Sequence, residues 1–177
     1  MDILRKKTIP VKKIDNNLIS LVENMFFTMR NADGIGLAAP QVNNNLSLAV
    51  VDISCVDKYK DEKPLLMINP VIEDIHGECL MSEGCLSLPE IRAEITRPEQ
   101  IFLKFYDINM KEIKQEFNEL MARVIQHEID HLYGKLLIDY LDKDVLKTFK
   151  KKLTEIKKGK INTEYPLHIY NDNFHGY

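Results

Sequence analysis

The stretch from about Glu116 to Tyr133 constrains the fold more than any other part of this sequence. Its apolar residues recur at helical spacing, but they cover more of the helix than a narrow stripe: Phe117, Leu120, Met121, Val124, Ile125, Ile129 and Leu132. Gly134 supplies a helix stop directly afterwards. The pattern therefore predicts a buried helix, around which the rest of the chain must fold.

Three ionisable side chains interrupt this apolar helix in the segment QHEIDH. His127 and His131 are four residues apart, and Glu128 directly follows the first of them. Residues at this spacing project from one face of a helix, so both imidazoles point to the core-facing side. Two neutral imidazoles can bind one divalent metal there, and the adjacent carboxylate can accept a proton from water. Either histidine alone is most often a structural core residue, but the combined spacing favours a metal site.

A hydrolytic metal site normally has three protein ligands and one open position, so a third ligand is needed. The residues after His131 do not follow the ligand spacing of the zinc peptidases that share the HExxH pattern. The segment MSEGCLSLP offers Cys85, which follows Gly84, a residue that allows close backbone approach. A thiolate there would complete a Cys/His/His site. A lone cysteine is more often a small buried residue, and we interpret Cys55 and Cys79 in that way.

The segment GIGLAAPQ, from Gly34 to Gln41, is unusually rich in small residues. Glycines and alanines leave a backbone that another chain can approach closely, and Gln41 offers an amide donor. The segment lacks the Lys-Ser/Thr pair of a phosphate loop and the third glycine of a dinucleotide-binding motif. A helix stop followed by a small-residue strand explains the same pattern without any ligand.

The remaining patterns predict a single α+β domain over residues 1–177, with antiparallel β-sheets surrounding the central helix. Apolar residues between 18 and 29 recur at helical spacing, with Asp15 as the cap and Gly34 beyond the end, and predict an N-terminal helix. Short alternating runs between residues 46 and 108 predict the strands. Residues 144–160 predict a basic C-terminal helix, and we expect the aromatic-rich segment 161–177 to pack on the domain or on a second copy.

Composition argues against several classes of protein. The formal charge of −3 and the pI near 6.0 give no general attraction to nucleic acid. No apolar run approaches the roughly 18 residues of a membrane span, and the N-terminus lacks the apolar run of a signal peptide. Three cysteines without an export signal argue against a disulfide framework. We therefore expect a cytoplasmic protein that binds neither DNA nor membranes.

The segments GIGLAAPQ, EGCLSLP and QHEIDH, in this order and at these intervals, resemble the three signature motifs of the peptide deformylase family. The resemblance covers roughly Gly34 to Leu141. It implies a metal-dependent hydrolase that removes the formyl group from the N-terminal formyl-methionine of nascent polypeptides and releases formate. An HExxH-type metallopeptidase is the alternative, disfavoured by the missing downstream ligand. A structural metal site is a third interpretation, but it would require a fourth protein ligand.

The resemblance also implies roles for particular residues. Cys85, His127 and His131 would hold one divalent metal, Fe²⁺ in the cell, with Zn²⁺, Ni²⁺ or Co²⁺ as substitutes. Glu128 would transfer the proton, and the Gln41 amide and the Leu86 backbone N–H would stabilise the oxyanion. The formylmethionyl peptide would add as a strand beside backbone from Gly36, Glu83 and Gly84. Its methionine side chain would enter a pocket formed by Ile35, Leu120, Val124 and the His127 ring.

Three further features keep two interpretations each. Arg123 adjoins the methionine pocket, and either its stem packs along the pocket or its guanidinium points away. Asp130 is either paired with an arginine such as Arg97 or solvated. The basic helix from Asp144 to Lys160 is either a solvated surface helix or a docking element for ribosomal RNA.

Overall fold

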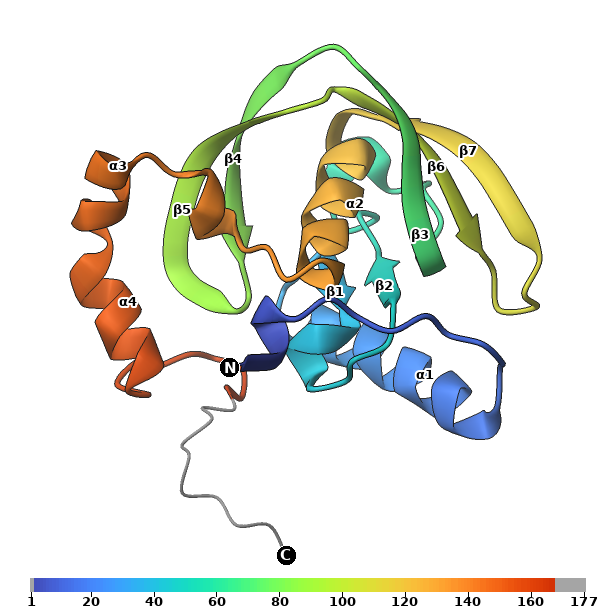
Figure 1. The fold of residues 1–177 in the computed structure, drawn as a ribbon, viewed down its shortest axis with the longest axis horizontal. Helices are drawn as coiled ribbons and strands as arrows, with labels where there is room; N and C mark the ends of the chain where they lie inside the picture. The colour runs from blue at the N-terminus through green and yellow to red at the C-terminus, as the bar shows by residue number, and fades with distance from the viewer. Residues whose placement is uncertain (1, 168–177) are drawn as a thin grey trace, which may run out of the picture.

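A five-stranded antiparallel sheet and a two-stranded hairpin lie on opposite sides of a central helix (Figure 1). The computed structural model describes residues 2–167. The larger sheet has the order β1-β2-β3-β6-β7, and β4 and β5 form the hairpin. The strands are β1 (Gly36–Ala38), β2 (Leu48–Val51), β3 (Leu65–His76), β4 (Cys79–Cys85), β5 (Leu88–Arg97), β6 (Gln100–Tyr106) and β7 (Glu112–Asn118). The helices are α1 (Asn16–Asn31), α2 (Glu119–Leu132), α3 (Lys143–Thr148) and α4 (Lys150–Lys157). The predicted α+β class, with sheets around a central helix, is confirmed.

The central helix α2 is shorter at its start than the sequence pattern predicts. It begins at Glu119, because residues 116–118 belong to β7, where Phe117 pairs with Ile101 of β6. A single apolar residue at that position fits helical spacing and strand alternation equally well. The predicted stop at Gly134 is confirmed, since this glycine has a φ of +75° and a Cβ there would lie 2.7 Å from the backbone of Arg5.

The N-terminal helix α1 matches its prediction closely. The Asp15 side chain accepts a hydrogen bond from the Leu18 backbone N–H at 3.0 Å and caps the helix. At the other end, Asp33 rather than Gly34 adopts the left-handed conformation, with a φ of 51°. The Gly34 N–H donates to the Met29 carbonyl at 2.9 Å and closes the last turn. This ending delivers the chain directly into β1 beside the central helix.

The predicted continuous helix over 144–160 is wrong, because the chain forms two helices that meet at Phe149. Phe149, Leu153 and Ile156 pack against the buried face of β5, so this contact fixes the direction of α4 separately from α3. Figure 1 shows α4 beside β5, with the chain then returning towards the hairpin turn. The aromatic-rich segment is described only to residue 167, and the rest of that prediction lies outside the described residues.

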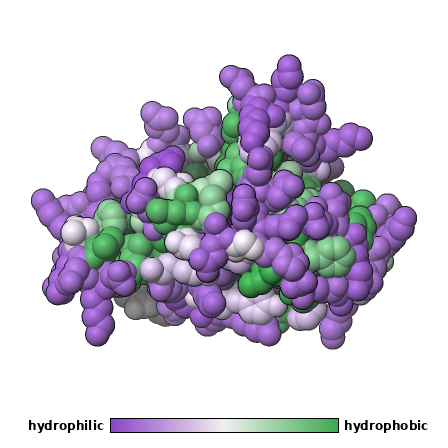
Figure 2. All heavy atoms as spheres, turned by 90° about the horizontal axis from the view of Figure 1, so that it is seen from above, coloured by the Kyte–Doolittle hydropathy of each residue, from purple (hydrophilic) through white to green (hydrophobic). Residues whose placement is uncertain are grey.

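The surface shows no broad apolar face in the view of Figure 2, where apolar side chains are scattered among hydrophilic ones. Within the described residues, no helix has both the length and the apolarity that crossing a bilayer requires. The large buried side chains instead surround α2, where Ile125 and Leu132 pack with Met67, Leu103 and Phe105 of the sheet. The central helix is therefore held rigidly between its neighbours.

Candidate active site

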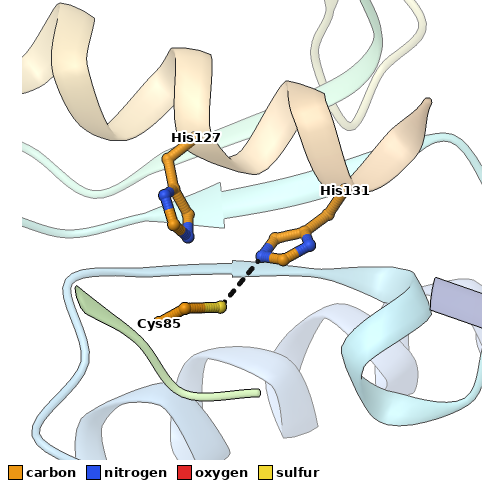
Figure 3. Close-up of side chains that lie close together, drawn as sticks. All are labelled: Cys85, His127 and His131. Carbon is orange, nitrogen blue, oxygen red and sulfur yellow. Dashed lines mark hydrogen bonds between the residues drawn. The ribbon is translucent and has the colours of Figure 1, made fainter. Parts of the chain in front are cut away.

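Three side chains of types that bind metals converge from two elements that face each other. His127 and His131 extend from α2, and Cys85 lies at the end of β4 opposite them (Figure 3). The Cys85 Sγ is 3.3 Å from the His131 Nε2, and the ligand atoms of the three residues lie within 4.8 Å of one another. The imidazole rings stand nearly perpendicular, at 81°, with centroids 5.0 Å apart. The predicted ligand set is thus brought together at one point.

The chemistry of these residues fits a divalent metal. Burial alone would raise the pKa of Cys85, but His131 and His127 lower it to about 5 and favour the thiolate that binds metals. His127 directs its Nδ1 to Glu83 at 3.0 Å, which leaves its Nε2 for a metal. A thiolate and two imidazoles make three protein ligands, the number found at catalytic sites that keep one position open.

Glu128 lies beside these ligands and is almost fully buried, with 3% of its surface exposed. Burial raises the pKa of Glu128 to about 7, although the positive charges of His127 and His131 act in the opposite direction. One of its oxygens, Oε2, has no hydrogen-bond partner among the described residues. The other lies against Gly36, because a Cβ built on that glycine would be 2.5 Å from the Glu128 Oε1. A carboxyl group so placed can accept a proton and return it.

A buried ion cluster behind His127 was not anticipated from the sequence, which assigned Glu83 only a backbone role. The Glu83 carboxylate accepts hydrogen bonds from the Arg97 Nε at 2.7 Å, from the Arg123 guanidinium at 2.8 Å and from His127. Burial alone would raise the pKa of Glu83, but the hydrogen bonds from His127 and Arg97 lower it to about 2. The carboxylate therefore stays charged and fixes the orientation of the His127 ring.

The same cluster decides two interpretations that the sequence left open. The Arg123 guanidinium is directed to the hairpin, where it donates to Glu83 and to the backbone carbonyls of Ile95 and Cys79. Asp130 is paired rather than solvated, because it accepts from Arg97 at 2.6 Å and from the Tyr140 hydroxyl at 2.8 Å. Arg123 therefore lines the cleft as a residue whose charge is compensated by Glu83.

A cleft of about 760 Å³ opens beside the ligand residues. It is lined by every site residue predicted from the sequence except His131: Ile35, Gly36, Gln41, Glu83, Gly84, Cys85, Leu86, Leu120, Val124, His127 and Glu128. His131 lies behind the cleft and is 1% exposed. A cavity of this size is in the range that binds small molecules and short peptides. The structure thus places the predicted ligand residues at the base of a substrate-sized opening.

Gln41 and the hairpin turn meet at one side of this cleft. The Ala38 backbone N–H donates to the Gln41 Oε1 at 2.7 Å, which directs the Gln41 Nε2 towards Ser87 at 3.3 Å. The same Nε2 lies 4.0 Å from the Cys85 Sγ. Leu86 follows Cys85 in the turn, and its carbonyl accepts a hydrogen bond from the Tyr165 hydroxyl at 3.0 Å. Tyr165 belongs to the aromatic-rich segment that we expect to pack on the domain, but its partner Leu86, 79 residues away along the chain, could not be predicted.

The buried HExxH helix, the cysteine from the facing hairpin and the adjoining cleft together define a metal-dependent hydrolase. The model of the family described as polypeptide deformylase matches residues 1–147. The chain is 48% identical to the peptide deformylase of Pelodictyon phaeoclathratiforme over 94% of its own length and 88% of that relative. It is 46% identical to that of Chlorobium phaeovibrioides over 94% and 87% of the two chains.

A solved structure agrees with these sequence matches. The crystal structure of a peptide deformylase from Legionella pneumophila superposes with a TM-score of 0.81 at 36% identity, covering 90% of this chain and 92% of that one. The chain belongs to the polypeptide deformylase family. It is a divalent-metal-dependent hydrolase that removes the N-formyl group from the formyl-methionine of nascent polypeptides. This membership sets aside the alternative of an HExxH-type metallopeptidase.

Proposed function

We propose that Glu128 is the residue that moves the proton during deformylation. A divalent metal, when bound by Cys85, His127 and His131, lowers the pKa of water and polarises the formyl carbonyl. Glu128 accepts the proton of the attacking water and then delivers a proton to the amine nitrogen as the C–N bond breaks. The observation that carries this proposal is the buried Glu128 carboxyl, which borders the cleft directly beside the three ligand residues.

We further propose that Gln41 and Leu86 stabilise the negative charge that develops on the formyl oxygen. The hydrogen bond from Ala38 orients the Gln41 amide so that its N–H groups face the ligand cluster. The Leu86 N–H belongs to the turn that follows Cys85 and lines the same cleft. Removing one such donor costs about 2.7–4 kcal/mol of transition-state stabilisation in comparable sites.

The peptide substrate is proposed to bind between two strand edges. Among the described residues, β1 is the outer strand of the larger sheet and β4 pairs only with β5, so both have a free edge. Gly36 in β1 and the Glu83–Gly84 pair in β4 line one cleft, where an extended peptide can pair with either backbone. Ile35, Leu120 and Val124 supply the apolar surface for the methionine side chain.

The identity of the metal and the cellular setting are also proposals. We propose Fe²⁺ as the metal in the cell, because a Cys/His/His set suits several divalent transition metals and the family resemblance favours iron. Nascent formylmethionyl chains are made in the cytoplasm, where we place this enzyme.

We propose that residues 1–177 form one catalytic domain. The proposal is supported by one apolar cluster that joins Leu4, β5 and α4.

The exposed lysines of the C-terminal helices are proposed to contact the ribosome. They are exposed to solvent in the two helices: Lys143, Lys147, Lys150, Lys151 and Lys157. Phosphate contacts made by such residues weaken as salt increases. Ribosome cosedimentation of the parent should therefore fall with salt, and a Lys150→Glu/Lys151→Glu variant should bind less at low salt. Equal binding of parent and variant at every salt concentration would exclude this role.

Formate release from a formyl-Met-Ala-Ser peptide tests the catalytic proposal. The protein would be purified without oxygen, or reloaded with Ni²⁺, and compared with a Glu128→Ala variant of equal metal content. We expect release by the parent and a loss of at least about a hundredfold in the variant. Similar rates in the two proteins would remove Glu128 from the mechanism, whereas no release by the fully metallated parent would refute the proposed activity.

A further inference from the structure

One side of the cleft is formed by the chain after α4, and not by the edges of β1 and β4. One side comes from residues 31–36 and a second from the hairpin residues 82–92. The third comes from Asn162, Thr163, Glu164 and Tyr165, which follow α4. The match to the family model ends at residue 147, before this segment begins. Figure 1 shows the chain turning back after α4 to pass near the hairpin turn.

A hydrogen bond from Tyr165 connects residues 162–165 to the hairpin turn. Its hydroxyl donates to the Leu86 carbonyl at 3.0 Å, and its ring is partly buried. The same turn is held on its other side by the hydrogen bond from Gln41 to Ser87 and by contact between Leu86 and Gly34. The Thr163 hydroxyl also donates to the Tyr165 carbonyl, which bends the segment locally. The C-terminal segment is therefore tied to the turn that carries Leu86.

The segment borders the cleft without filling it. A cavity of about 760 Å³ remains with residues 162–165 in place, which is ample for a peptide of several residues. The proposed methionine pocket draws on no residue of this segment, because Ile35 directly precedes β1, and Leu120, Val124 and His127 belong to α2. Residues 162–165 can therefore contact only the part of a substrate that follows the methionine.

We propose that Asn162–Tyr165 forms a third wall of the peptide cleft and that Tyr165 is a specificity-determining residue, which holds this wall against the hairpin turn. The proposal rests on the deformylase function proposed above. It predicts that the wall favours formylated chains that extend beyond methionine over formyl-methionine alone. Tyr165 thereby acts on substrate selection and takes no part in proton transfer.

The test compares two substrates, formyl-methionine amide and formyl-Met-Ala-Ser amide. We expect Tyr165→Phe, which removes only the hydroxyl, to lower kcat/KM for the tripeptide by about two- to tenfold, as for the loss of one hydrogen bond. Tyr165→Ala, which also removes the ring, should lower it further. For both variants, the loss with the tripeptide should exceed the loss with formyl-methionine amide, and for Tyr165→Ala it should do so by at least about threefold. Tyr106→Phe is the matched control, because it removes a hydroxyl that bonds to Glu112 on an exposed part of β6 and β7.

A binding measurement separates this proposal from the activity itself. The product peptide Met-Ala-Ser amide should bind the Tyr165→Ala variant more weakly than the parent, while methionine amide should show a smaller difference. If the parent released no formate, the proposed function would fail, yet this binding comparison would still decide whether residues 162–165 form a wall. Unchanged substrate ratios in both variants, or faster turnover of the tripeptide after either substitution, would overturn the proposal.

Discussion

Glu83 is a single buried carboxylate that accepts hydrogen bonds from three donors: His127, Arg97 and Arg123. It stands between a metal-ligating ring on one side and two buried guanidinium groups on the other. Such a partner fixes the orientation of the ligating histidine and strengthens its binding to the metal. It also compensates the charges of two arginines that have little access to water. One side chain therefore supports both the metal site and the packing behind it.

A Glu83→Gln substitution should weaken metal binding by about 10- to 100-fold, because the amide no longer accepts a strong hydrogen bond from the His127 ring. Competition with a chelator measures this change directly. Glu73→Gln is the control, since it removes a carboxylate that pairs with Lys114 and Lys104 at the surface. Equal metal affinity in the two variants would show that the Glu83 contact does not support the site.

A Gly36→Ala substitution should impair catalysis while leaving the metal bound. The added Cβ would lie 2.5 Å from the Glu128 Oε1 and 2.7 Å from the Val124 Cγ1, so the carboxyl group must move. We expect kcat to fall by about a hundredfold, because catalysis is sensitive to displacements of about 1 Å. Metal content serves as the internal control, and full activity with full metal content would contradict this account.

The convergence of Cys85, His127 and His131 could be predicted from the sequence, and most of the contacts that support them could not. The spacing of His127 and His131 on a helix fixes their geometry locally, and the motif around Cys85 identifies the third ligand. The pairing of Arg97 and Arg123 with Glu83 depends instead on the register of β4 with β5 and on how α2 packs against them. Tyr165 reaches Leu86 through a turn of the chain that no local pattern encodes.

At the scale of elements, α4 combines an apolar side that faces the hairpin with a basic side that faces outward. The contacts of Phe149, Leu153 and Ile156 extend the same apolar cluster that contains Cys85 and Leu88. The helix therefore stabilises the strand pair that carries the cysteine ligand. It also sets the point from which the chain returns to the cleft.

A Leu153→Ala substitution should lower the free energy of unfolding by about 1–2 kcal/mol, because the leucine side chain is only partly buried against β5. Unfolding in urea, followed by circular dichroism, measures this loss. Lys157→Ala, on the exposed side of the same helix, should change the free energy by less than about 0.5 kcal/mol. Equal effects of the two substitutions would mean that α4 does not pack on the hairpin in solution.

Element boundaries were harder to predict than element types. The start of α2 was placed too early because Phe117 fits a strand and a helix alike, and strand pairing with Ile101 decides between them. The division of the C-terminal helix at Phe149 follows from packing on β5, a contact between distant parts of the chain. The N-terminal helix was predicted well because Asp15 caps it through a local hydrogen bond.

At the scale of the whole molecule, the ligand residues connect the hairpin to the central helix. Cys85 belongs to β4, whereas both histidines belong to α2, so a bound metal would add a second polar link between two elements that the ion pairs of Glu83 already connect. Loading with Ni²⁺ to about 1,000 times its Kd should stabilise the fold by about 4 kcal/mol. For a chain of this length, the melting temperature should rise by about 10 °C.

Thermal unfolding with and without a chelator measures this linkage. A Cys85→Ala variant is the control, because it keeps both histidines but removes the thiolate through which the metal would bind the hairpin. Its melting temperature should respond much less to added Ni²⁺ than that of the parent. A metal-dependent rise of equal size in the variant would show that the metal does not join the two elements.

The two strand edges that line the cleft have a consequence for how the protein behaves in a crowded solution. Unpaired edges expose hydrogen-bonding groups that other chains can join, which is a common route to aggregation. Here the free edges of β1 and β4 line a single cleft that is bordered on a third side by residues 162–165. A lone extended peptide can enter such a space, but the edge of another folded sheet is too bulky to do so. The arrangement that captures a flexible chain end therefore also keeps these two edges from pairing with the sheet of another folded copy.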